Sequence, residues 1–295
     1  GRLYGLIASF ALLATALVGG SAWYINGEAQ AGQLTKAIFA AKPSELRKLI
    51  DESLPPYRRW ADPRLKQSAS AEDAAPEQRL KASLALVPVD GTQVDFLSRR
   101  LLDCSVDEFP VVRDYLKPHR GTVETDLWQV FRDAAQLGQA RFHAGMALAA
   151  YAADAAGWTK ADADFLAAQL LASNPDNQRD LRSYLEPIGG QLLEPLEVRF
   201  RDATARDTVR EAAANALADF AANEPARLAG LASEATAEQY RIIYPRLIAA
   251  QAEQRAAAEK ALLAITQQQP GAKVPESDRV QLGRRRAGAA ISLLR

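Results

Sequence analysis

Apolar residues recur along the chain at the spacing of α-helices. Leu80, Leu84 and Val87 stand three or four residues apart, which places them on one face of a helix, and Phe142 and Met146 begin the same arrangement further on. Alanine, leucine and long charged side chains also dominate the composition, and these residue types favour helix over sheet. The pattern predicts an all-α protein.

A Leu-x-Pro motif marks an internal repeat. Its three copies begin at Leu54, Leu116 and Leu185, which are 62 and 69 residues apart. In each copy an Arg-x-x-Ala-x-x-Ala-Leu pattern follows 25 residues after the leucine, starting at Arg79, Arg141 and Arg210. A further helix follows each arginine helix, as in Phe96-Leu97 and Phe165-Leu166. The constant offset predicts units of about three helices that bury their faces by stacking on their neighbours.

A fourth unit is longer and incomplete. It runs from Leu247 to Arg286, 39 residues on, and residues 266–280 read as a polar loop insertion because they contain Pro270, Gly271 and Pro275. The chain ends before the third helix of this unit, so we expect the last repeat to be truncated. Residues of the final helix should then be less buried than their counterparts in earlier units, namely Ile291, Leu293 and Leu294 against Leu84, Leu86 and Leu148.

The arginine helix resembles the second helix of a HEAT repeat. Members of that family carry an acidic residue about six positions before the arginine, as Asp73 precedes Arg79, whereas Asp133 and Asp207 stand at other offsets. The units are therefore HEAT-like. The resemblance implies an α-solenoid of about four units of 62–69 residues over residues 28–295.

Residues 3–25 carry no charge and are rich in leucine, alanine and valine. At 1.5 Å per residue they are long enough to cross a bilayer core about 30 Å thick. Tyr4 lies near one end and Trp23 and Tyr24 near the other, as in interfacial aromatic belts. We interpret residues 1–27 as a transmembrane anchor that makes the protein single-pass.

Two alternatives to the anchor remain. A secretory signal peptide would end at a small-x-small site such as Ala29-Gln30-Ala31, which lies some way past the apolar stretch. A buried core helix would not need to be apolar on every face.

Charge and residue counts exclude several function classes. The 36 basic and 36 acidic side chains balance, and a nucleic-acid-binding protein would show a basic excess. Cys104 ends an apolar helix and is expected to be structural, while His119 and His143 have no cysteine or carboxylate at ligand spacing. We therefore predict no catalytic residue, no metal site and no cofactor.

One local cluster offers a partner contact. Tyr57, Arg58, Arg59 and Trp60 place aromatic rings beside guanidinium groups, as peptide- and carbohydrate-binding surfaces do. In the alternative interpretation Trp60 fills a gap between helices and the arginines are solvated. A run of three arginines, 284–286, is expected to be an exposed helical turn.

A closer resemblance covers most of the chain. The charge-free span, then ELRKLIDESLPPYRRWADPRL at 45–65, RLKASLALVPVD at 79–90 and DEFPVVRDYLKPHR at 107–120, resemble the region after the transmembrane helix of large planctomycete membrane proteins. In that group a serine/threonine protein kinase domain commonly precedes the span, and a domain resembling the formylglycine-generating, sulfatase-modifying fold often follows. The chain carries no Gly-rich phosphate loop, no His-Arg-Asp and no Asp-Phe-Gly motif.

The resemblance implies a function without chemistry of its own. We expect a membrane-anchored scaffold that binds a protein or peptide partner, within a longer signalling protein whose repeat region is extracytoplasmic. The start at Gly1 instead of methionine agrees with a fragment. The alternative is the accessory region of an enzyme whose C-terminal domain resembles the formylglycine-generating family.

Overall fold

Helices make up most of the part of the chain that the structure describes. A computed structural model describes residues 26–71, 73–271 and 275–294, and these contain no β-strand. The all-α prediction is confirmed. The chain divides into two compact units, residues 1–126 and 127–295.

The first unit is built from short helices. Residues 26–40 are helical, and they are followed by α2 (Pro43–Lys48), α3 (Arg58–Ser70), α4 (Pro76–Leu86), α5 (Val94–Leu101) and α6 (Phe109–Leu116). The next helix, α7 (Arg120–Arg132), crosses the boundary between the units.

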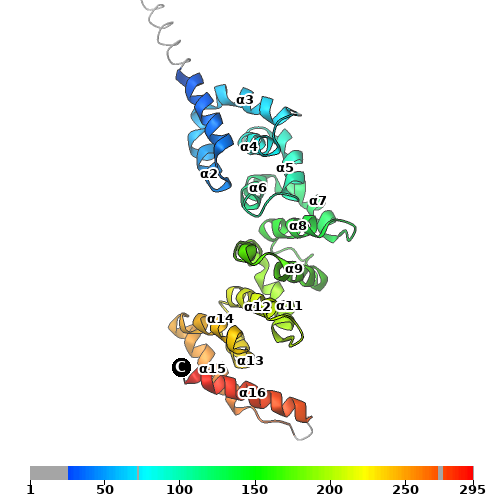
Figure 1. Cartoon of the computed structure of the whole chain (residues 1–295), viewed down its shortest axis with the longest axis vertical. Helices are drawn as coiled ribbons and strands as arrows, with labels where there is room; N and C mark the ends of the chain where they lie inside the picture. The colour runs from blue at the N-terminus through cyan, green and yellow to red at the C-terminus, as the bar shows by residue number, and fades with distance from the viewer. Residues whose placement is uncertain (1–25, 72, 272–274, 295) are drawn as a thin grey trace, which may run out of the picture. The chain divides into compact units, whose positions relative to one another are not determined.

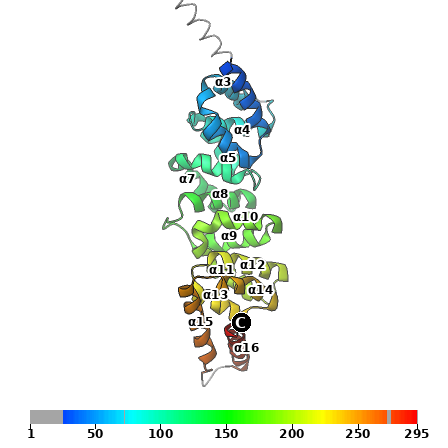
Figure 2. The ribbon, with the colours of Figure 1, turned by 90° about the vertical axis from the view of Figure 1, so that its left-hand side faces the viewer.

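The second unit continues with helices of 8 to 18 residues. These are α8 (Gly138–Tyr151), α9 (Lys160–Ala172), α10 (Gln178–Leu185), α11 (Gly189–Arg201), α12 (Asp207–Phe220), α13 (Pro225–Glu234), α14 (Ala237–Ile248), α15 (Ala252–Gln267) and α16 (Glu276–Leu293). Helix α11 packs on α9 and α12, and α13 packs on α14, α15 and α16. Figures 1 and 2 show these helices lying against one another in chain order within this unit.

Each Leu-x-Pro motif has the same local structure. The proline is the middle residue of a 3₁₀ turn, at Pro55–Tyr57, Lys117–His119 and Glu186–Ile188. Each turn leads directly into a helix of 13 residues, α3, α7 or α11. Proline suits this place because its fixed φ matches the first turn of a helix, where its missing N–H loses no hydrogen bond.

The fourth copy of the motif differs. Leu247 lies within α14 and Ala249 caps that helix, so a single helix stands where the earlier units have a 3₁₀ turn. The predicted loop insertion at 266–280 is too long, because α15 extends to Gln267 and α16 begins at Glu276. The acidic first turn of α16, with Glu276 and Asp278, favours a helix N-terminus there.

The arginine helices form the core of each repeat unit. Seven consecutive residues of α4, Leu80 to Leu86, and eight of α8, Phe142 to Ala149, are buried. The first alanine of the pattern, at 82, 144 and 213, is 0% exposed in all three helices. Small side chains allow neighbouring helices to approach from more than one side, which accounts for the complete burial of these alanines.

The final helix is less covered than the earlier ones. Ile291 is 51% exposed and Leu294 is 87% exposed, whereas Leu84, Leu86 and Leu148 are at most 1% exposed. The predicted difference in burial is therefore confirmed.

The predicted membrane span at residues 3–25 lies outside the described residues. Within the described ranges, no helix combines the length and the apolar character that crossing a bilayer requires.

Candidate functional site

The four residues of the predicted partner contact do not share one exposed surface. Trp60 is 8% exposed, and its ring lies against the helical residues 26–40, where a Cβ added to Gly27 would come within 2.7 Å of it. Arg58 donates a hydrogen bond of 3.1 Å to the carbonyl oxygen of Ala85. Tyr57 is half-buried and Arg59 is exposed. The predicted contact of this cluster with a partner stays a prediction, and Arg59 is its most accessible member.

The repeat arginines interact mainly with their own units. The guanidinium of Arg79 lies 4.6 Å from the ring centroid of Phe96, and that of Arg141 lies 4.0 Å from the ring of Phe165. Arg141 also donates to the carbonyl oxygen of Phe131 at 2.9 Å, near the C-terminus of α7. These cation–π and helix-end contacts give the arginines a structural role.

The third and fourth arginines lack this aromatic partner. The residue before Leu228, where α5 and α9 carry phenylalanine, is Arg227. Arg210 instead pairs with Asp207 at 2.5 Å within α12. Arg286 donates to the carbonyl oxygen of Thr266 at 2.9 Å, near the C-terminus of α15.

The cysteine and the two histidines are buried or half-buried. Cys104 is 1% exposed, its thiol donates to the carbonyl oxygen of Leu101 at 3.4 Å, and burial raises its pKa to about 12. His143 is buried in α8 and His119 is half-buried in a 3₁₀ turn. Among the described residues, no three or more histidine, cysteine and acidic side chains gather into a set that could hold a metal ion.

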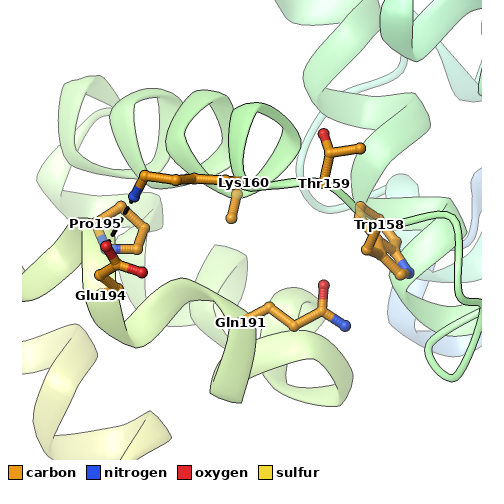
Figure 3. Close-up of a pocket in the computed structure, with 7 residues that line it drawn as sticks. Trp158, Thr159, Lys160, Gln191, Glu194 and Pro195 are labelled. Atoms are coloured by element: carbon orange, nitrogen blue, oxygen red, sulfur yellow. Dashed lines mark hydrogen bonds and ion pairs between the residues drawn. The ribbon is translucent and has the colours of Figure 1, made fainter.

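A small cavity lies between α9 and α11. It holds about 220 Å³, with Trp158 at one end and the ion pair of Lys160 with Glu194, 2.9 Å long, at the other (Figure 3). The indole is fixed by its hydrogen bond to the carbonyl oxygen of Ala152 and by edge-to-face contacts with Trp128. Both members of the ion pair are largely exposed, so water screens them and the cavity offers little to hold a ligand.

A much larger groove lies where the ends of α9 and α11, the α10 helix and the start of α12 meet. It holds about 1050 Å³. Its apolar lining includes Leu171, Val209 and Ala212, and its charged lining consists of four arginines and two carboxylates, namely Arg179, Arg182, Arg199, Arg206, Asp202 and Glu211. A surface of this size and mixed character is suited to an extended segment of another chain.

Two of the four arginines are already neutralised. Arg182 pairs with Asp219 at 2.7 Å and Arg199 with Asp202 at 3.7 Å. Arg179 and Arg206 are exposed and make no ion pair or side-chain hydrogen bond to any residue in the described ranges. These two guanidinium groups are therefore available to a ligand.

The loop before α12 shapes one wall of the groove. Asp202 accepts hydrogen bonds from the hydroxyl and the main-chain N–H of Thr204, at 2.6 and 2.9 Å, and these bonds hold the pKa of Asp202 below its ordinary value. Asp133 accepts from the N–H of Ala135 at 2.9 Å in the equivalent loop before α8. Both aspartates stand eight residues before a repeat arginine. Their hydrogen bonds to residues two positions further on stabilise the turn of each loop.

Sequence reasoning did not find the groove. Its lining comes from four segments that only the packing brings together, and Arg179 and Arg206 belong to no repeated pattern. The one available signal was the Arg-Asp-Ala triplet at 132–134 and 201–203, which marks the two equivalent loops.

No protein-family model and no curated protein matches the sequence.

Proposed function

We propose that this chain is a HEAT-like α-solenoid scaffold that binds a protein or peptide partner. Three successive units in which a 3₁₀ turn, a 13-residue helix and a buried arginine helix recur support the repeat architecture. The groove at α9–α12, with two arginines free to contact a ligand, is the observation that carries the binding role.

We further propose that the scaffold is anchored in a membrane by residues 3–25 and belongs to a transmembrane signalling protein. Support comes from the apolar sequence of that stretch and from the resemblance to the membrane-proximal region of planctomycete serine/threonine kinases. The repeat region would then be extracytoplasmic. Reporter fusions placed after residue 40 test this topology, and activity of a cytoplasmic reporter at that position contradicts it.

The scaffold role assigns no reaction to this chain. Its sole cysteine, Cys104, is buried with a raised pKa, which opposes formation of the reactive thiolate.

Photo-crosslinking in cells tests the binding role. A photoreactive amino acid replaces Thr208, which lines the groove, or Glu238, which is exposed at the start of α14 and does not line it. We expect a defined crosslinked protein from position 208 and none from 238. Equal crosslinking at both positions, or none at either, contradicts a binding role for the groove.

A further inference from the structure

The groove at α9–α12 carries a local excess of positive charge in a chain without net charge. Four arginines face two carboxylates along its walls, while the whole chain has 36 basic and 36 acidic residues. Arg182 and Arg199 are occupied by Asp219 and Asp202, so the positive charge offered to a ligand comes from Arg179 and Arg206. The carboxylate of Glu211, which also lines the groove, offsets part of this charge and leaves a net positive surface. A guanidinium group presents several N–H donors in a plane and suits a carboxylate.

The start of α12 adds to this preference for negative charge. Arg206 precedes the helix and makes no side-chain cap, and Arg206, Thr208 and Val209 all line the groove. The N-terminus of a helix carries partial positive charge on its unpaired N–H groups. The carboxylate of Asp207 in this first turn is engaged by Arg210 at 2.5 Å.

The remaining lining selects among anionic ligands. The apolar lining consists of aliphatic side chains such as Leu171, Ala172 and Ala212, and the lining residues in the described part of the chain include no aromatic ring. Single-stranded nucleic acid is held largely by stacking of its bases on aromatic rings, which this surface does not offer. A volume of about 1050 Å³ lies at the upper end of the range for small-molecule sites and leaves room for a peptide segment.

We propose that this groove binds an acidic peptide segment of a partner protein. Arg179 and Arg206 contact its carboxylates, and apolar residues between those carboxylates pack on the alanine and leucine lining. This inference rests on the proposed scaffold function and names the chemistry of its ligand.

Binding of defined peptides tests the proposal. The full chain in an uncharged detergent is titrated with fluorescent 12-residue peptides built from Glu and Ala, from Gln and Ala, or from Lys and Ala, and with an oligothymidylate. We expect the Glu peptide to bind at least tenfold more tightly than the Gln and Lys peptides and the oligonucleotide. Binding should weaken with added salt, because charged contacts are screened.

A charge-matched pair of variants locates the site. R179E/R206E should bind the Glu peptide at least tenfold more weakly and should gain affinity for the Lys peptide. R241E/R284E makes the same change in net charge at exposed arginines that do not line the groove, and it should change the affinity less than twofold. R179Q/R206Q, which removes charge without reversing it, serves if the first variant melts at a lower temperature than the wild type.

Three results would overturn the proposal. These are equal binding of the Glu and Gln peptides, equal loss of affinity in both double variants, and tighter binding of the oligonucleotide than of the Glu peptide. If the crosslink at position 208 captures a protein while the Glu peptide does not bind, the scaffold role stands and the acidic ligand is wrong. If neither is observed, both fail.

Discussion

Burial makes the thiol of Cys104 unreactive. Cys104 ends an apolar helix in the sequence, and the expectation of a structural cysteine agrees with its 1% exposure. Burial raises the pKa of its thiol to about 12, so almost no thiolate exists at neutral pH.

The reactivity of Cys104 follows from that environment. At pH 8 the native chain should react with a thiol reagent at least a hundredfold more slowly than the chain unfolded in guanidinium, as followed by absorbance. Reaction at the same rate in both states would contradict the buried position.

Asp162 contributes a pH-dependent stabilisation. It pairs with Arg132 at 2.8 Å and completes a capping box with Thr159 at the start of α9. Burial opposes its ionisation, but the hydrogen bonds from Arg132 and Thr159 outweigh burial and hold the pKa of Asp162 below its ordinary value. A lowered folded-state pKa means that the stabilisation is present at neutral pH and is lost as the pH falls through that pKa.

We therefore predict that D162N lowers the free energy of unfolding by about 1 kcal/mol at pH 7. The value is modest because Arg132 is 43% exposed and water screens the pair. The difference between variant and wild type should begin to shrink at about pH 4, the pKa of the carboxyl in the unfolded chain, and should continue to shrink down to the lower pKa of the folded state. Chemical denaturation at pH 7 and pH 3 measures this, and a difference that grows on acidification would contradict it.

Gly288 has no room for a side chain, and the sequence pattern does not indicate this. A Cβ at this position would lie 2.3 Å from the carbonyl oxygen of Ser233, so α16 approaches the backbone of α13 directly. G288A should separate these helices and lower the melting temperature by several degrees, corresponding to roughly 1–3 kcal/mol. G283A is the matched control, because a Cβ there has nothing within 4 Å. Equal melting temperatures for the two variants would show that the contact is absent.

At the scale of helices, the spacing of the repeated motifs predicted the positions of the buried helices. The spacing of the Leu-x-Pro motifs and arginines located α4, α8 and α12, because a buried helix repeats its small residues on a fixed period. It did not predict the 3₁₀ turns, the helical course of α14 or the start of α16 at Glu276. Those depend on capping and on packing against residues distant in sequence, which a local pattern does not contain.

The arginine helices should tolerate no larger side chain at their first alanine. A144L should lower the free energy of unfolding by roughly 1–3 kcal/mol, because Ala144 is 0% exposed and the added atoms must displace its neighbours. A256L, on the exposed side of α15, controls for the change in residue type. Similar denaturation midpoints for both variants would mean that the assigned face of α8 is wrong.

At the scale of the whole chain, composition predicted the fold class and not the site. Balanced charge and abundant alanine indicate a helical protein, but the groove exists only where α9, α10, α11 and α12 meet and the loop before α12 turns at Asp202. The predicted contact at residues 57–60 is continuous in the sequence, but the structure largely buries its tryptophan.

Hydrogen–deuterium exchange of the full chain with and without the Glu peptide tests whether the groove binds an acidic peptide. Backbone amides at residues 172–178 and 202–209, which border the groove, should exchange more slowly when the peptide is bound. Residues 249–251, between α14 and α15, should be unaffected. Protection confined to segments outside the groove, or no protection at a saturating peptide concentration, would contradict the account.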